Sequence, residues 1–250
     1  STPKPSSAAS DVYKRQDDPQ TTIIRRHIIN SKPFLNSIYR EWYQRLDIPP
    51  EGIVVELGSG GGFLSSVHAQ VIMTEIFHLA HISLVANATC LPFRSGSVRM
   101  FALVDVFHHI PNVGKFLAEA ERCLEERGEI AMIEPWHTVW SRFIYQHLHP
   151  EPFEPGADWS IPTSGPLTGA NGALPWIVFE RDLHVFRRLF PNLTLNTKTL
   201  MMPISYLLSG GVSMRSLMPG FLYSFIRFIE NRLPHDLFAM FALLRISKNI

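Results

Sequence analysis

A short apolar run that contains an acid and then breaks into glycines constrains this chain more than any other feature. Residues 53–57 read Ile-Val-Val-Glu-Leu, and Gly58, Gly60 and Gly62 follow directly. A β-branched run of this length predicts a strand that is covered on both faces of a parallel sheet. Glycine adopts positive φ and carries no Cβ, so a ligand can approach the backbone of this turn closely. The sequence therefore predicts a ligand-binding turn at the end of a buried strand.

The spacing of the glycines distinguishes two kinds of nucleotide site. The dinucleotide fingerprint G-x-G-x-x-G requires glycine at position 63, where this chain has Phe63. The pattern that is present, E-x-G-x-G-x-G, resembles motif I of the class I S-adenosylmethionine (SAM) dependent methyltransferases, and in particular the type 11 methyltransferase-like domain. The resemblance implies that Glu56 orders the loop and the amino-acid end of SAM. It also implies that the cofactor lies on the loop backbone, at Gly58, Ser59, Gly60 and Gly62.

Two further segments agree with this resemblance. Residues 71–75 form a second apolar run that ends in Glu75, close to the distance at which a doubly wound fold places a ribose-binding carboxylate. Residues 87–93 read N-A-T-C-L-P-F and resemble the family's D-A-x-x-L-P-F loop. The resemblance implies that Glu75 accepts both ribose hydroxyls and that Asn87 and Ala88 lie at the adenine. An Asn carbonyl oxygen can accept the adenine hydrogen bond, although without charge assistance.

The remaining apolar patterns complete the predicted fold. Residues 98–106 predict a strand, residues 113–126 a helix with apolar residues at 3-and-4 spacing, and residues 129–134 a strand that Gly128 separates from that helix. Residues 193–200 and 238–246 predict the last two strands. The resemblance, which covers about residues 50–135, implies an α/β, Rossmann-like doubly wound fold. Its seven-stranded, mostly parallel sheet has an antiparallel last strand and a loop-rich insertion after the fifth strand.

Candidate catalytic residues stand at the ends of two of these strands. The resemblance places Asp105 and Val106 beside the SAM methyl group. His108, His109 and His137 follow, and an imidazole can act as a general base because its ordinary pKa lies near 6.5. We expect these histidines to be catalytic, although His109 can equally be a buried residue that ties its strand to the next helix. The same histidines with Asp105 are chemically competent to bind a metal. Paired histidines also occur in relatives without a metal, and we expect none.

The chain ends and the long insertion define the domain organisation. Residues 6–16 match the translation of a common transposase sequencing adapter, so we expect residues 1–16 to be a non-native artefact on a sequencing fragment. Residues 17–250 are expected to form a single domain with a helical lid at 17–49. Residues 136–175 and 201–235 are expected to form the substrate side. We expect an acceptor pocket with walls that include Trp136, Trp140, Phe143, Met214 and Phe221.

Composition excludes some partners. The net charge is +1 without a dense lysine or arginine cluster, so we expect no nucleic-acid partner. The two cysteines give no disulfide framework, which favours a cytoplasmic protein. No apolar run reaches the roughly 18–20 residues of a bilayer span. Contact of the apolar stretch 201–235 with a membrane surface remains an open alternative.

The sequence thus predicts a SAM-dependent methyltransferase that acts on a small, partly apolar acceptor, either lipid-like or aromatic. Oxygen, nitrogen and carbon nucleophiles all remain open, because the fold does not choose among them. The alternative is a non-catalytic SAM-binding or partner-binding protein with the same fold. A nicotinamide oxidoreductase is disfavoured by Phe63 and by the loop at Asn87.

Overall fold

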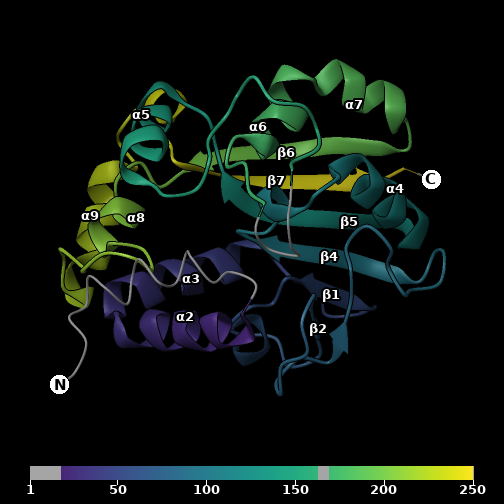
Figure 1. Cartoon of the computed structure of the whole chain (residues 1–250), viewed down its shortest axis with the longest axis horizontal. Coiled ribbons are helices and arrows are strands. Elements are labelled where there is room, and N and C mark those ends of the chain that lie inside the picture. The colour runs from purple at the N-terminus through teal and green to yellow at the C-terminus, as the bar shows by residue number, and fades with distance from the viewer. Residues whose placement is uncertain (1–17, 163–168, 250) are drawn as a thin grey trace.

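The computed structural model describes residues 18–162 and 169–249, which build a seven-stranded sheet in the order β3-β2-β1-β4-β5-β7-β6 (Figure 1). Neighbouring strands from β3 to β5 are parallel, and β7 is antiparallel to both β5 and β6. This confirms the predicted doubly wound sheet with its antiparallel last strand. The strands are β1 (Val54–Leu57), β2 (Ile72–Glu75), β3 (Leu84–Val85), β4 (Val98–Val104), β5 (Leu124–Pro135), β6 (Leu193–Met201) and β7 (Phe241–Lys248).

The chain enters the fold through two helices, α2 (Pro19–Ser31) and α3 (Pro33–Arg45). They are separate because Lys32 is extended and Pro33 starts the second helix, a position where the missing N–H of proline costs nothing. The inner face of α3 is fully buried, and its Trp42 lies with its ring centroid 4.8 Å from that of Phe241 on β7. This packing fixes the N-terminal helices against the sheet.

The boundary between the central helix and the fifth strand differs from the sequence expectation. Helix α4 (Val113–Cys123) is capped by Asn112 and ends three residues early, and β5 begins at once with Leu124. Gly128 therefore lies inside the strand instead of before it. The start of β5 is irregular, because Arg127 has a φ of 62° and the register against β4 shifts there. A Cβ at Gly128 would lie 3.0 Å from the carbonyl oxygen of Val98, so the tight packing of this bulge favours glycine.

The insertion after β5 is more regular than its composition indicates. Helix α5 (Val139–Leu148) occupies ten of its residues and starts with a capping box between Thr138 and Ser141. Figure 1 shows α5, α8 and α9 gathered at one end of the sheet, beside α2 and α3. The other helical segments are 3-10 turns at Leu64–Ser66, Phe107–His109 and Gly220–Leu222, a π turn at Ile177–Arg181, and the helices α6 (Leu174–Trp176), α7 (Leu183–Leu189), α8 (Ser205–Ser209), α9 (Tyr223–Glu230) and α10 (His235–Phe238).

A buried ionic cluster joins three of these helices. Arg227 on α9 contacts Glu41 on α3 at 2.6 Å and also pairs with Glu230. The Glu230 carboxylate accepts a hydrogen bond from the backbone N–H of Ser205 at 2.8 Å. Burial raises the pKa of Glu41, but hydrogen bonds from Arg227 and Tyr223 outweigh it and lower that pKa to about 2. The cluster ties the N-terminal helices to the segment after β6.

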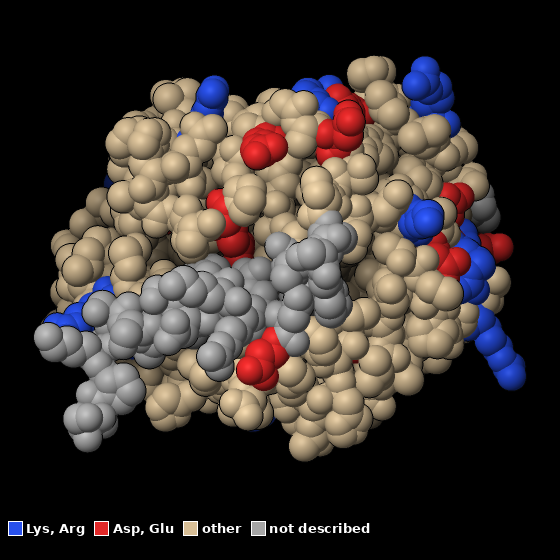
Figure 2. Space-filling model, in the orientation of Figure 1, with Lys and Arg blue, Asp and Glu red and all other residues tan. Residues whose placement is uncertain are grey.

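The surface gives two further observations. On the described part of the face in Figure 2, lysine and arginine side chains are scattered and do not gather into one patch. Among residues 18–162 and 169–249, no helix is both long enough and apolar enough to cross a bilayer. Residues 1–16, which we expect from the sequence to be an adapter artefact, lie outside the described part of the chain.

Candidate active site

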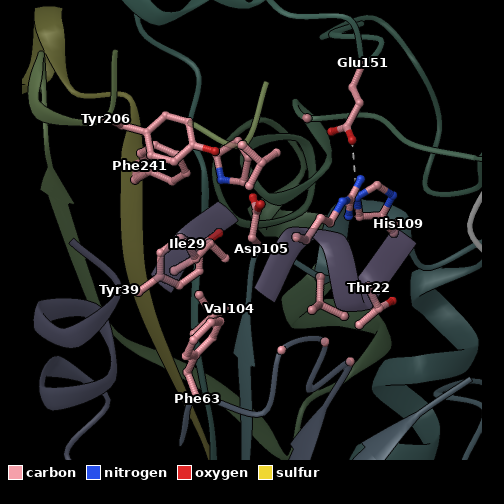
Figure 3. A pocket seen from close by; sticks show the side chains of 18 of the residues that line it. Thr22, Ile29, Tyr39, Phe63, Val104, Asp105, His109, Glu151, Tyr206 and Phe241 are labelled. Carbon is pink, nitrogen blue, oxygen red and sulfur yellow. Dashed lines mark ion pairs between the residues drawn. The ribbon is translucent and has the colours of Figure 1, made fainter. Parts of the chain in front are cut away.

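A cavity opens where the carboxyl ends of β1, β2 and β4 meet, the edge at which doubly wound sheets bind ligands (Figure 3). Its walls come from segments that are far apart in the sequence. The described lining residues are Thr22, Arg25 and Ile29 of α2; Tyr39 and Tyr43 of α3; Gly58–Gly61, Phe63 and Glu75; Val104, Asp105, Val106 and His109; Pro135, Tyr145, His149, Glu151, Pro152, Phe153 and Gly172; and Tyr206, Val212 and Phe241.

The three glycines of the loop have positive φ, but they serve different purposes. A Cβ at Gly58 would lie 2.7 Å from Val106, and one at Gly62 would lie 2.8 Å from His81, so both are required by packing within the protein. A Cβ at Gly60 would meet nothing closer than 3.8 Å, although the φ of this residue is 49°. Gly60 lines the cavity, so its missing side chain leaves space that a ligand can fill.

Glu75 holds the glycine loop from the neighbouring strand. Its carboxylate accepts hydrogen bonds from the backbone N–H of Gly60 at 3.1 Å and of Ile76 at 2.9 Å. The side chain is nearly buried and lines the cavity. Each carboxylate oxygen has a second lone pair, so Glu75 can still accept bonds from a ligand.

Glu56 lies behind the cavity wall, on β1. It is 2 % exposed, and its Oε2 has no hydrogen-bond partner among the described residues. Burial, together with the nearby Glu75, raises its pKa to about 8, against the smaller lowering effects of Ser59 and Tyr43. Ser59 and Tyr43 contact the cavity, whereas Glu56 does not line it. Glu56 thus lies behind the loop that the resemblance implies it orders, and its role at the amino-acid end of SAM stays a prediction.

The predicted adenine loop lies outside the cavity lining, as do Glu56 and Gly62 of the predicted cofactor site. The side-chain oxygen of Asn87 accepts hydrogen bonds from the N–H and the hydroxyl of Thr89, at 2.9 Å and 2.8 Å. Asn87 is exposed, and neither Asn87 nor Ala88 lines the cavity. In this structure, Asn87 stabilises its own turn.

Asp105 and Val106 lie at the cavity as predicted, directly after β4. Asp105 has a φ of 62°, a conformation that costs energy for a residue with a Cβ. Burial and the neighbouring carboxylates of Glu134 and Glu151 raise its pKa to about 6, although His108 opposes this. Val106 packs on Gly58, so the turn after β4 and the glycine loop support each other.

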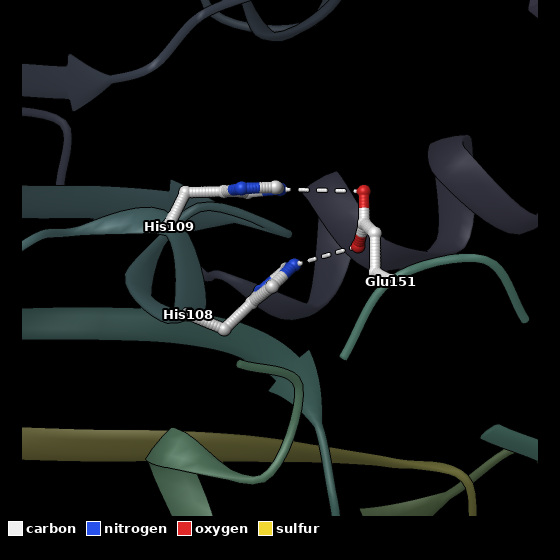
Figure 4. Close-up of side chains that lie close together, drawn as sticks. All are labelled: His108, His109 and Glu151. Carbon is white, nitrogen blue, oxygen red and sulfur yellow. Dashed lines mark ion pairs between the residues drawn. The ribbon is translucent and has the colours of Figure 1, made fainter. Parts of the chain in front are cut away.

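His108 is buried behind the cavity and belongs to a carboxylate network (Figure 4). Its Nδ1–H donates to Glu134 Oε2 at 2.7 Å, and its Nε2 lies 3.5 Å from Glu151 Oε2. Glu134 also accepts the backbone N–H groups of Val106 and Phe107, so it fixes the whole turn. Burial lowers the pKa of His108, but the bonds with Glu134 and Glu151 outweigh it and hold that pKa well above its ordinary value.

His109 faces the cavity. Its Nδ1–H donates to the carbonyl oxygen of Gly169 at 3.1 Å, which leaves Nε2 without a proton in the neutral ring. Nε2 lies 3.8 Å from Glu151 Oε1, as Figures 3 and 4 show. Burial and repulsion from His108 lower the pKa of His109 to about 4. A neutral ring can accept a proton or bind a cation at Nε2.

His137 stands apart from this site, contrary to the sequence expectation that groups it with the other two histidines. Its ring stacks against Phe153 and packs on Trp176, with centroids 5.9 Å and 4.5 Å apart, and it does not line the cavity. Burial lowers its pKa. The chain leaves the sheet at this point, so the ring packs in the aromatic core of the insertion.

None of the five predicted acceptor-wall residues lines the main cavity, although the predicted segments 136–175 and 201–235 both contribute to it. Trp136 is buried elsewhere, Trp140 donates its Nε1–H to the carbonyl oxygen of Pro203, and Phe143 and Phe221 are exposed. Met214 is half exposed and lines a second, smaller pocket. The residues that line the main cavity instead include Arg25, Ile29, Tyr145, Glu151 and Phe153, none of which the sequence analysis singled out. Helical spacing was the available signal for Tyr145, because it shares the inner face of α5 with Ser141 and Ile144.

The sequence matches a known protein family over part of its length. A family model for a methyltransferase domain matches residues 55–132. No curated protein matches the chain in sequence.

Solved structures share the fold at low identity. A chain from the complex of the Haloferax volcanii Trm112 methyltransferase activator with a methyltransferase is 12% identical, with a TM-score of 0.51 over 90% of this chain and 92% of that one. Geranyl diphosphate C-methyltransferase from Streptomyces coelicolor is 13% identical (TM-score 0.49; 90% and 84% covered). A SAM-dependent methyltransferase from Thermotoga maritima is 16% identical (TM-score 0.49; 90% and 99% covered).

The matched segment spans the glycine loop, Glu75 and the turn after β4, which are the cofactor-side parts of the cavity. The predicted family resemblance is thus confirmed, and with it SAM as the cofactor that such a domain implies. Residues 55–132 carry a methyltransferase domain, built on the fold of the class I SAM-dependent methyltransferases.

Proposed function

We propose that this protein transfers the methyl group of SAM to a small, partly apolar acceptor that binds in the cavity beside His109. The observation that carries the proposal is the opening at Gly60. This residue keeps a backbone conformation that costs other residues energy, and, apart from its own chain neighbours, no atom of the described residues lies closer than 3.8 Å to the place that a Cβ would take. It faces the same cavity as Glu75 and His109.

The cofactor side of the cavity fits SAM. The loop backbone at Ser59 and Gly60 can lie against the ligand, and Glu75 can accept hydroxyl groups with its remaining lone pairs. The buried Glu56, whose Oε2 has no hydrogen-bond partner among the described residues, lies behind Ser59, where a ligand ammonium group would favour its ionised form. When bound, SAM supplies an electrophilic methyl group on a sulfonium.

The acceptor side combines apolar walls with one proton acceptor. Ile29, Phe153 and Phe241 can contact an aliphatic or aromatic body and exclude water. The hydrogen bond from Nδ1 to Gly169 fixes the tautomer of His109, so Nε2 can accept a bond from an acceptor hydroxyl or amine. His109 is therefore the histidine that we assign to the acceptor, while His108 positions it and His137 plays no direct part.

The test has two stages. Titration calorimetry with SAM and with NAD first examines the cofactor, and Glu75→Ala should weaken SAM binding by roughly 1.5–3 kcal/mol, the usual value of a hydrogen bond to a charged group. Release of S-adenosylhomocysteine is then measured with a panel of small phenols, alcohols, amines and carboxylic acids. Turnover that His109→Ala abolishes and His137→Ala preserves supports the proposal. Tight SAM binding without any turnover favours the non-catalytic alternative, and binding of NAD alone refutes both.

A further inference from the structure

Three side chains converge on one point at the edge of the cavity, and only two of them are neighbours in the sequence. Nε2 of His108 and Nε2 of His109 face the same carboxylate, that of Glu151, from distances of 3.5 Å and 3.8 Å (Figure 4). One ligand atom from each residue lies within 4.8 Å of the other two. Glu151 comes from the loop after α5 and is 43 and 42 positions away from the two histidines in the numbering.

Both imidazole rings are oriented from behind by hydrogen bonds at Nδ1. His108 donates to the buried carboxylate of Glu134 at 2.7 Å, and His109 donates to the carbonyl oxygen of Gly169 at 3.1 Å. Histidines that bind metals are held in this way, because a bond at one nitrogen fixes the tautomer and turns the other lone pair toward the ion. Two rings held in this way face one carboxylate, so that three potential metal ligands lie together.

The local charge is consistent with a divalent ion. Asp105 Oδ1 lies 4.0 Å from His108 Nε2, so the carboxylates of Asp105, Glu134 and Glu151 surround the two rings. Arg25 is the only lysine or arginine among the described residues that line the cavity. Among the described residues, the carboxylates around the two rings therefore outnumber the arginines.

We propose that His108, His109 and Glu151 form a binding site for a divalent transition-metal ion of the zinc type, with an open position toward the cavity. Two imidazoles and one carboxylate are the protein ligands of catalytic zinc sites, which keep a further position for water or substrate. Bonds of about 2.0–2.2 Å to such an ion bring ligand atoms to roughly 3–3.6 Å from one another. The two distances to Glu151, 3.5 Å and 3.8 Å, lie at or just beyond this range, and the ligand atoms of all three residues lie within 4.8 Å of one another.

The proposed ion adds a class of acceptor to the proposed function, and this extension rests on that function. An ion at this position would bind an oxygen or nitrogen of the acceptor directly, so that acceptors with a hydroxyl, carboxylate or amine group are favoured. His109 would then act as a ligand, and the ion would lower the pKa of the acceptor hydroxyl. Metal binding itself does not depend on methyl transfer, so the two proposals can fail separately.

The test uses the full chain after removal of any histidine tag and treatment with a chelator. Titration with Co²⁺ is followed by visible absorption, and titration with Zn²⁺ by calorimetry and by the melting temperature. We expect one ion per chain with a dissociation constant of roughly micromolar or below, and a rise in melting temperature on binding. Glu151→Gln should weaken binding by about 100-fold or more, and Glu134→Gln by about 10-fold, since Glu134 orients His108 and the turn that carries it without binding the ion itself.

Matched controls make the result decisive. Glu154→Gln changes an exposed carboxylate in the same loop, and His147→Ala removes an exposed histidine of α5, so both should bind the ions like the unmodified protein. Glu151→Gln should still bind SAM, which separates the loss of this site from a failure of the proposed function. Absence of stoichiometric binding, or equal binding by a folded Glu151→Gln protein, would show that the cluster is an ion-pair network without a metal. Loss of metal binding in His147→Ala would show that the ion binds at a different place.

Discussion

The two sides of the cavity are built in different ways. The cofactor side is local: Gly58, Gly60 and Glu75 lie within one strand-turn-strand segment, and backbone hydrogen bonds such as Ser59 N–H to Thr74 O at 2.8 Å hold it together. The acceptor side is assembled from distant segments, with Ile29 from α2 and Phe153 from the loop after α5. Local motifs therefore specify the cofactor side, whereas the acceptor side depends on how whole helices pack.

The difference extends to the chemistry of the two sides. The cofactor side presents backbone groups and carboxylates in a turn that is required by its own packing. The acceptor side presents side chains that other side chains orient, as Glu134 orients His108. We expect substitutions on the cofactor side to affect SAM alone, and substitutions on the acceptor side to affect turnover while SAM affinity stays constant. The following changes test this separation.

The largest effect is expected for Gly60→Val. A β-branched side chain would fill the opening in the cavity, so SAM binding should fall by more than about 100-fold, or roughly 3 kcal/mol. Gly96→Val is the matched control, because Gly96 also has a positive φ and open space, but lies exposed in a turn outside the cavity. Both variants should lose similar stability, of about 1–2 kcal/mol, and only the first should lose SAM in calorimetry. Equal SAM affinity in the two folded variants would refute the role of the opening.

The second-largest effect is expected for Glu56→Gln, which should change the free energy of unfolding and its dependence on pH. Burial raises the pKa of Glu56 to about 8 from its ordinary value of 4.5. The stability that this group contributes is therefore complete below pH 4.5 and is lost as the pH rises to 8. Glu56→Gln removes the titration, so it should increase the free energy of unfolding by about 3 kcal/mol near pH 7, with the gain shrinking toward pH 4.5.

Denaturant unfolding of the free protein at several pH values measures this change. The control is Glu126→Gln, which changes an exposed glutamate and should show no such gain. If Glu56 also supports the bound cofactor, Glu56→Gln should bind SAM more weakly although it is more stable. A gain that is constant from pH 5 to pH 8 would contradict the raised pKa.

The smallest effect is expected on the acceptor side. Ile29→Val removes one buried methylene from the cavity wall, which costs about 1 kcal/mol of contact with an apolar acceptor. The value of kcat/KM for an acceptor found in the turnover screen should fall about fivefold, with SAM affinity unchanged. Ile24→Val on the exposed face of the same helix should change neither. An equal loss for SAM and acceptor would show that the two sides are not separate.

Particular residues show how far the sequence could predict the site. Gly60, Glu75 and Asp105 were found because each stands at the end of a recognisable strand, and they all line the cavity. His137 stands at such an end too, but packing turned it away between Phe153 and Trp176. Glu151 follows no recognisable strand and was missed. Being apolar was not enough to place Trp140 or Phe143, since many apolar residues compete for the same core.

The sequence by itself determined the sheet and the cofactor-side turn, because strand burial and glycine conformation depend on residues that are close together in the chain. Only the tertiary structure decided which helix faces close the cavity and which carboxylate meets the histidine pair. The position of α3, on which α2 packs, is set by long-range contacts, such as Trp42 on Phe241 and Arg227 on Glu41. Such contacts join residues nearly two hundred positions apart, so no local pattern encodes them.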